Sequence, residues 1–227
     1  KLAGLVVAGA IALQATLTFE DTRNPPLDVK VTSTREQGSA VLRDISFAML
    51  DAGVRNNATI VEPKKAAADP RPAVLFVHWY GPPRPTSNRT QFIPDAVDLA
   101  GSGVVSLLID TPWSDPEYFK KRKREEDYTR SVQQVKDLRR ALDVLLVQPN
   151  VDPTRVAYVG HDFGAMYGVL EAANDPRVRA FVFMAGAPSF SDWFLYGSAM
   201  PPDARQKFID QLAPLDPTRY LAQLDVP

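Results

Sequence analysis

One stretch decides the fold: Arg155-Val156-Ala157-Tyr158-Val159-Gly160-His161-Asp162-Phe163-Gly164-Ala165-Met166. An apolar, strand-like run leads into Gly160, and a helix-like run begins directly after Gly164. A nucleophile at the tip of such a strand-to-helix turn has a strained backbone, and bulky residues two positions to either side would collide with neighbouring chain. Glycine at both positions removes the collisions. The pattern therefore predicts a nucleophile elbow with Asp162 at its tip and His161 and Phe163 beside it.

The composition is that of a single globular domain. The chain has 227 residues, of which 45% are hydrophobic, and a formal net charge of −1, so it can bury one substantial core. Basic and acidic residues nearly cancel and no basic stripe recurs, so we expect no nucleic-acid partner. Cysteine is absent, which excludes disulfides and thiolate catalysis. No cluster of metal ligands is visible in the sequence, and we predict neither a metal nor a cofactor.

The N-terminal residues form an uncharged apolar run. Leu2–Leu13 is too short to span a bilayer comfortably, so no stable membrane span is predicted, and Ala10-Ile11-Ala12 has the form of a cleavage site. We interpret residues 1–16 as the remnant of a secretory signal peptide, with the true start missing, which predicts a periplasmic or secreted protein. The alternative is a helix or strand packed on a cytoplasmic domain. Residues 17–39 follow as a linker or N-terminal segment.

Strand and helix patterns alternate through residues 40–227. We expect strands at 29–33, 40–49, 58–61, 73–77, 104–109, 155–159 and 180–185, and helices at 93–100, 132–146, 165–173 and 204–212. The first three strands are short and separated by turns, which is typical of an antiparallel entry to a sheet. The later alternation predicts one α/β domain with a mostly parallel, doubly wound sheet that is covered on both faces.

Polar and aromatic residues follow the predicted strands where each one ends. These ends carry His78-Trp79-Tyr80-Gly81, then Asp110-Thr111-Pro112-Trp113, then Asp162, and then the run Gly186–Trp193. In a parallel sheet such loops gather at one edge. With these residues the chain resembles the α/β-hydrolase superfamily, in particular its dienelactone-hydrolase-like and acetyl-xylan-esterase-like branch. The resemblance covers residues 40–227 and implies an incomplete α/β-hydrolase domain that lacks its last strands.

The resemblance also implies an oxyanion hole. In that family the first loop begins His-Gly, and the residue after the glycine donates its backbone N–H. Here Trp79 stands in the place of the glycine, so the resemblance assigns the two donors to Tyr80 and Phe163. Two aligned donors stabilise charge that appears only in the transition state. The alternative is that His78 and Trp79 simply pack over the end of the sheet.

Aspartate at the elbow changes the expected chemistry. A carboxylate is already ionised at neutral pH and attacks without a base, after which a histidine must activate water to hydrolyse the ester. In the superfamily, an elbow aspartate is typical of epoxide hydrolases and haloalkane dehalogenases, whereas the sequence from Phe183 to Phe194 looks more like the esterase-type branch. The resemblance implies a hydrolase for a small ester-like or related substrate. The alternatives are an epoxide hydrolase or dehalogenase-type enzyme, and a non-catalytic binding protein of this fold.

The general base is the missing part of this site. His78 and His161 both precede Asp162, whereas the order in this fold is nucleophile, acid, histidine. Relatives carry the acid and the histidine after the next two strands, so we expect both beyond residue 227. These 227 residues alone are then expected to hydrolyse nothing appreciably. Asp192 is a weak substitute for the acid, and the simpler interpretation makes it the N-cap of a short helix.

The remaining features are less specific. Trp113 and Trp193, with Phe194 and Tyr196, are candidates for the walls of a substrate cleft, although aromatic residues of this kind also build cores. The charged run from Lys120 to Asp127 predicts a solvated helix start or loop. The expected partner is a small-molecule substrate, and the sequence leaves the oligomeric state open.

Overall fold

The computed structural model describes residues 17–66, 68–82 and 84–224. The predicted signal remnant, residues 1–16, lies outside the described residues. The strands are β1 (Lys30–Gln37), β2 (Ala40–Ala48), β3 (Arg55–Pro63), β4 (Arg71–Val77), β5 (Val105–Ile109), β6 (Val151–His161) and β7 (Ala180–Met184). The α-helices are α1 (Ile93–Gly101), α2 (Tyr118–Lys121), α3 (Asp127–Leu146), α4 (Phe163–Asn174), α5 (Phe190–Phe194), α6 (Pro202–Leu212) and α7 (Thr218–Leu221). Short 3-10 helices lie at Pro112–Ser114, Arg124–Glu126 and Ala213–Leu215.

The strands form one seven-stranded mixed sheet in the order β1-β2-β3-β5-β4-β6-β7. The strands β1, β2 and β3 pair antiparallel in turn, which confirms the predicted antiparallel entry, and β3 also pairs antiparallel with β5. The strands β5, β4, β6 and β7 pair parallel. The first strand falls inside residues 17–39, so this N-terminal segment contributes an edge strand to the sheet.

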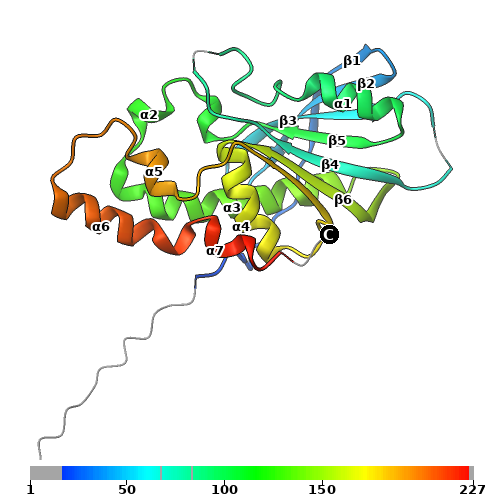
Figure 1. Cartoon of the computed structure of the whole chain (residues 1–227). Coiled ribbons are helices and arrows are strands. Elements are labelled where there is room, and N and C mark those ends of the chain that lie inside the picture. Colours follow the sequence, from blue (N-terminus) through cyan, green and yellow to red (C-terminus); the bar gives the residue numbers. More distant parts are fainter. Residues whose placement is uncertain (1–16, 67, 83, 225–227) are drawn as a thin grey trace, which may run out of the picture.

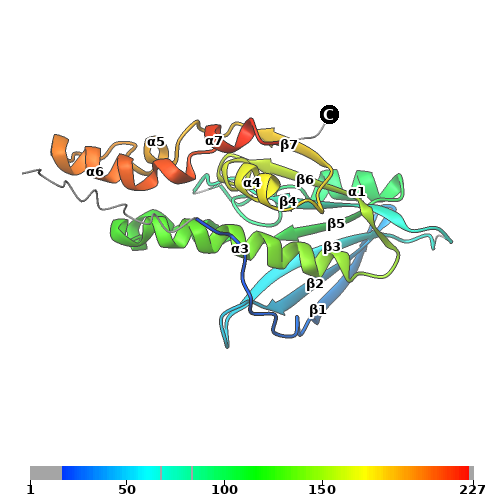
Figure 2. The same ribbon diagram turned by 90° about the horizontal axis from the view of Figure 1, so that it is seen from below.

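Helices cover both faces of the sheet, as Figures 1 and 2 show. On one face α1 packs against β2, β3 and β5, and its small buried residues Ala96 and Ala100 allow a close approach. On the other face lie α3 and α4. The apolar stripe of α3 recurs every three or four residues and faces the strands, because this spacing places its side chains on one side of a helix. The predicted α/β class is confirmed.

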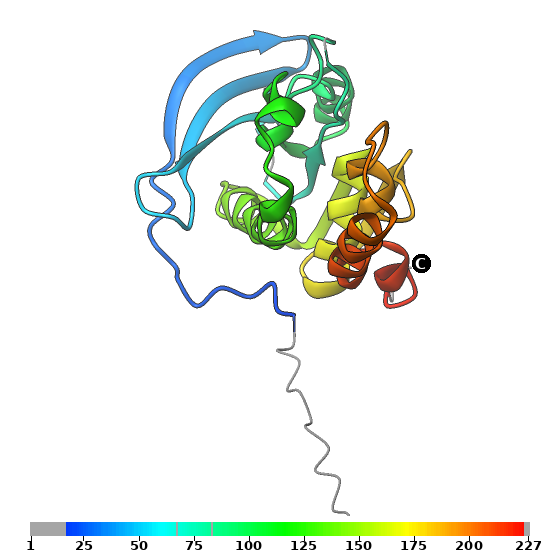
Figure 3. The ribbon, with the colours of Figure 1, turned by 90° about the vertical axis from the view of Figure 1, so that its left-hand side faces the viewer.

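The N-terminal segment is tied to α3 by a buried arginine. Arg140 is 2% exposed, and its guanidinium donates to the carbonyl oxygens of Ala48 at 3.1 Å and of Pro25 at 2.5 Å. Figure 3 shows this segment, in blue, running from the first strand past α3. Among the described helices none is both long and apolar enough to cross a membrane.

The parallel strands bring four loops to one edge of the sheet. The C-terminal ends of β4, β5, β6 and β7 are in register with one another. The loops that follow them therefore meet where α4 begins, and of the helices after β7 (orange to red in Figure 3) α7 packs against α4.

Candidate active site

The turn between β6 and α4 has the backbone geometry of a nucleophile elbow. Asp162 has φ 56° and ψ −114°, a conformation that is strained for a residue with a side chain. A Cβ atom on Gly160 would lie 2.3 Å from the carbonyl oxygen of Gly164, and one on Gly164 would lie 2.2 Å from that of Val77. Neither contact is sterically possible, so both positions require glycine. The absence of a side chain at Gly164 lets the turn pack directly against the backbone at the end of β4.

The Asp162 carboxylate is held by donors from two other loops. The backbone N–H of Tyr80 donates to Oδ2 at 3.1 Å, and the indole Nε1–H of Trp193 donates to Oδ1 at 2.5 Å. Asp162 is only 8% exposed. Burial raises the pKa of its carboxyl group, and the hydrogen bonds from Tyr80, Trp193 and the Phe163 N–H offset part of that rise. Both predicted oxyanion donors thus act on the carboxylate of Asp162 itself.

Aromatic rings form a wall beside this carboxylate. The indole of Trp193 stacks on Phe163 with ring centroids 4.8 Å apart, and Phe119 lies 5.6 Å from the same indole. Tyr80 completes the group, 4.9 Å from Phe119 and 5.8 Å from Trp193. Such rings exclude water and lower the local dielectric, which strengthens the hydrogen bonds to Asp162. The sequence did not indicate Phe119, because it precedes the charged run Lys120–Asp127 and belongs to no recognisable helix, strand or motif pattern.

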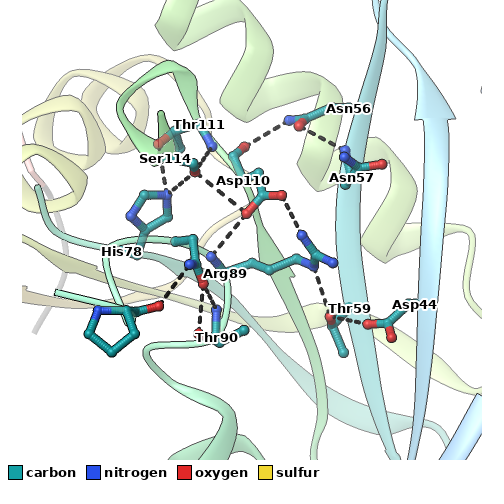
Figure 4. Close-up of polar contacts among 12 residues, drawn as sticks. Asp44, Asn56, Asn57, Thr59, His78, Arg89, Thr90, Asp110, Thr111 and Ser114 are labelled. Carbon is teal, nitrogen blue, oxygen red and sulfur yellow. Dashed lines mark hydrogen bonds and ion pairs between the residues drawn. The ribbon is translucent and has the colours of Figure 1, made fainter. Parts of the chain in front are cut away.

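His78 is sealed inside the loops after β4 and β5. It is 1% exposed; its Nδ1 bonds the carbonyl oxygen of Trp79 at 2.7 Å, and its Nε2 lies 2.8 Å from the hydroxyls of both Thr111 and Ser114 (Figure 4). Burial lowers the pKa of His78 to about 4, so the ring is neutral at pH 7. With both nitrogens engaged, His78 joins two loops and does not serve Asp162 as a base.

An ion pair fixes the loop after β5 from the other side. Arg89 donates from Nη1 to Oδ2 of Asp110 at 2.5 Å and from its backbone N–H to Oδ1 at 3.1 Å (Figure 4). The Nε of Arg89 also reaches the Thr59 hydroxyl on β3 at 3.3 Å. Asp110 is therefore a structural carboxylate that connects the strand ends. Arg89 carries no sequence signal of its own, because its partners are more than twenty residues away.

His161 turns toward Trp79 and not toward the carboxylate of its neighbour. Its ring stacks on Trp79, with centroids 5.5 Å apart and planes 2° apart, and its Nδ1 lies 2.7 Å from Nε2 of Gln91. The Oε1 of Gln91 accepts the backbone N–H of Trp79 at 2.8 Å. Gln91, which the sequence did not single out, therefore braces the loop that presents Tyr80.

Two further sequence candidates occupy structural positions. Trp113 is 1% exposed, stacks on Tyr167 at 5.4 Å and donates its indole N–H to the carbonyl oxygen of His78 at 3.1 Å, so it belongs to the core. The prediction that Asp192 caps a short helix is wrong. Ser189 is the N-cap of α5, and its hydroxyl oxygen accepts the backbone N–H of Asp192 at 3.1 Å.

The charged run also departs from its prediction. Most of its side chains are exposed, but Arg122 and Asp127 are 7% and 1% exposed and form an ion pair at 2.8 Å. The prediction of a solvated helix start or loop is therefore wrong at these two positions. Tyr196, a candidate for the cleft wall, is 87% exposed.

No group of three or more His, Cys, Asp or Glu side chains in the part of the chain that the structure describes is placed to hold a metal ion.

Comparison with known proteins places this arrangement in a family. The sequence model of the alpha/beta hydrolase family matches residues 74–226, which include most of β4, the elbow and α5 to α7. No curated protein sequence matches the chain.

Solved structures share the fold at low sequence identity. An acetyl xylan esterase from Paenibacillus sp. R4 is 16% identical, with a TM-score of 0.66 over 89% of this chain and 72% of that one. Acetyl xylan esterase 1 from Thermoanaerobacterium sp. JW/SL YS485 is 16% identical, with a TM-score of 0.58 over 89% and 68%. A glucuronoyl esterase from Solibacter usitatus is 17% identical, with a TM-score of 0.53 over 72% of this chain and 53% of that one. At such identities the likeness concerns the fold alone.

Proposed function

Since the chain belongs to the alpha/beta hydrolase family, we propose that it is a hydrolase of a small ester-like or related substrate and that Asp162 is its covalent nucleophile. One observation carries the proposal: a carboxylate stands at the tip of a strained elbow, with the backbone N–H of Tyr80 on one of its oxygens. Strained backbone of this kind is typical of functional residues.

Among the proposed ester-like or related substrates, the Tyr80 hydrogen bond favours those that Asp162 attacks at a saturated carbon over those that it attacks at an acyl carbon. An acyl substrate needs the oxyanion donors for its own carbonyl oxygen, but here Tyr80 donates to Oδ2 of Asp162. In displacement at a saturated carbon, Oδ1 forms the new C–O bond and the leaving group departs with its electron pair. Oδ2 then becomes the carbonyl oxygen of an enzyme ester, already beside Tyr80 and Phe163.

Hydrolysis of that ester would use the same two donors. Water attacks the carboxyl carbon of Asp162, and the negative charge develops on Oδ2. Backbone donors aligned on such an oxygen contribute about 3 kcal/mol each to the transition state. The bond between the carboxyl carbon and Oδ1 then breaks, and the alcohol leaves with Oδ1. Asp162 is regenerated with one oxygen from water.

The general base of the proposed mechanism is neither of the chain's two histidines. In the described part of the chain His78 and His161 are both engaged elsewhere, in contacts with Thr111 and Gln91 among others. The chain spans only 53–72% of the length of the solved structures compared above.

A non-catalytic binding protein is the second candidate. It is favoured because, among residues 17–66, 68–82 and 84–224, no histidine is placed as a base for Asp162: the His78 ring bonds Thr111 and the His161 ring bonds Gln91. In that case the elbow would hold a ligand against the aromatic wall without turnover.

Covalent labelling separates the candidates. The 227-residue chain is incubated with phenyl glycidyl ether, a saturated electrophile, and separately with phenyl acetate, and peptide mapping by mass spectrometry locates any adduct. An ester on Asp162 that accumulates with the epoxide supports the proposal, because no base is present to hydrolyse it. Asp162→Asn abolishes the adduct, while Asp192→Asn serves as the matched control from the adjacent loop. If neither reagent forms an adduct on Asp162, the proposal that Asp162 is a covalent nucleophile is wrong, and the non-catalytic binding protein is the candidate that remains.

A further inference from the structure

Arg122 is a buried cation inside a charged run that is otherwise largely exposed. Its Nε donates to both oxygens of Asp127, at 2.8 and 3.0 Å, and only 7% of its side chain is exposed. A buried ion pair is costly to form unless its remaining donors are also satisfied. The remaining donors of Arg122 are therefore informative about its role.

One of these donors reaches the helix that carries Trp193. The Nη2 of Arg122 donates to the carbonyl oxygen of Phe194 at 3.1 Å. Phe194 is the last residue of α5, and the carbonyl groups at a helix C-terminus have no partner within the helix. A cation at this end is favourable for the helix dipole as well. Arg122 thus holds the C-terminal end of a five-residue helix that has little stability of its own.

The guanidinium also lies over the ring of Phe119, which belongs to the aromatic wall, and over the neighbouring ring of Phe194. It sits 5.1 Å from the ring centre of Phe119 and 4.6 Å from that of Phe194. Phe119 in turn contacts Trp193, and both phenyl rings contact Phe163. Arginine over aromatic faces is a directional contact, so it fixes where these rings lie.

We propose that Arg122 is a positioning residue, which through the Phe194 carbonyl and the Phe119 ring holds the indole N–H of Trp193 on Oδ1 of Asp162. The inference rests on the proposed function in assigning Asp162 as the nucleophile. Arg122 does not touch the reacting atoms; it sets the orientation of the side chain that does. Asp127 fixes Arg122 from the start of α3.

The first test measures the indole directly. In protein labelled with 15N-tryptophan, the three indole N–H signals are recorded by NMR, and Trp193→Phe assigns the signal of Trp193. Arg122→Lys keeps a positive charge opposite Asp127 but lacks the planar fork that serves Asp127 and Phe194 together. The expected result is an upfield shift of the Trp193 signal, because its hydrogen bond to the carboxylate is weakened.

Arg124→Lys is the matched control. Arg124 lies two positions away and also contacts a ring and a hydroxyl, those of Phe208 and Ser198, but it has no link to Trp193. This variant is expected to leave the Trp193 signal and the labelling of Asp162 unchanged. If Arg122→Lys does not fold, as judged by thermal melting, the neutral pair Arg122→Gln with Asp127→Asn carries the same test.

The second test measures reactivity. The rate of Asp162 labelling by phenyl glycidyl ether is followed against pH in the wild type and in Arg122→Lys. We expect a loss of about tenfold in the variant and a midpoint displaced to higher pH, because the carboxylate loses a positioned donor. In a Trp193→Phe background, Arg122→Lys should have no further effect, since the donor it orients is gone.

The outcomes are distinct. An unchanged Trp193 signal in folded Arg122→Lys overturns the positioning role. A shifted signal supports it even if the wild type is never labelled, in which case the proposed nucleophile fails and the positioning role stands. A labelling loss that persists in the Trp193→Phe background would show that Arg122 acts by another route, and that result too overturns the inference.

Discussion

The indole N–H of Trp193 lies 2.5 Å from Oδ1 of Asp162, although the two residues belong to different loops. Burial raises the pKa of the Asp162 carboxyl group, and this hydrogen bond acts against that rise by stabilising the ionised form. Trp193 therefore helps to keep a buried carboxylate charged as well as oriented.

Trp193→Phe is expected to raise the pKa of Asp162 further, because the ring remains and the donor is lost. The measurement is the pH dependence of Asp162 labelling by phenyl glycidyl ether, whose midpoint should move to higher pH. Trp113→Phe is the control, since its indole N–H donates to the carbonyl oxygen of His78 and not to Asp162. Equal midpoints in the wild type and Trp193→Phe would contradict this prediction.

Gly164→Ala is expected to destabilise the fold by at least about 3 kcal/mol, because the new Cβ would lie 2.2 Å from the backbone of Val77 and neither chain can move away cheaply. Gly197→Ala provides the comparison. Gly197 has a positive φ, at 66°, but nothing lies within 4 Å of its Cβ position, so its replacement should cost only about 1 kcal/mol. Urea unfolding of both variants measures the difference, and similar losses would argue against the close approach at the elbow.

His78 should make stability fall in acid. Its pKa is lowered from 6.5 to about 4 by burial, so the unfolded chain binds a proton in a range where the folded protein does not. With respect to His78, the folded protein therefore has its full free energy of unfolding above pH 6.5. This free energy falls by up to about 1.4 kcal/mol per pH unit as the pH drops toward 4. His78→Gln, which keeps an acceptor for Thr111 and Ser114, should flatten this dependence in urea unfolding. The prediction would be refuted if NMR showed the imidazole of His78 titrating near pH 6.5 in the folded protein.

The elbow and the α/β fold could be predicted because their signals are local. Gly160 and Gly164 are required by contacts within one turn and with the adjacent strand, and the apolar stripe of α3 repeats at helical spacing. The antiparallel pairing of β3 with β5 was not predicted, since strand order depends on contacts between segments far apart in the chain.

The arrangement of the site could be predicted only in part, for the same physical reason. The sequence placed Tyr80 and Phe163 near Asp162, because strand ends meet at one edge of a sheet. It gave no means of finding that His78 faces Thr111, that His161 stacks on Trp79, or that Arg122 is buried. Each of these depends on side-chain directions that tertiary packing sets.

Glu171 provides a test of packing behind the elbow. It lies on α4, is fully buried, and neither of its carboxylate oxygens has a hydrogen-bond partner among the described residues. Burial, followed by the nearby charge of Asp175, raises its pKa from 4.5 to about 8. Between these values the unfolded chain releases a proton that the folded protein keeps, so stability is lost as the pH rises, by up to about 1.4 kcal/mol per unit.

Glu171→Met is therefore expected to stabilise the protein increasingly as the pH rises from 4.5 to 8, because the apolar replacement has no charge to bury. Urea unfolding at several pH values measures the effect, with the exposed Glu125→Met as control. The slopes of Glu171 and His78 have opposite signs between pH 4.5 and 6.5. Removing Glu171 alone should thus leave a protein whose stability rises with pH over this range. A variant that is less stable than the wild type at pH 8 would mean that the Glu171 carboxylate is stabilised by partners in solution.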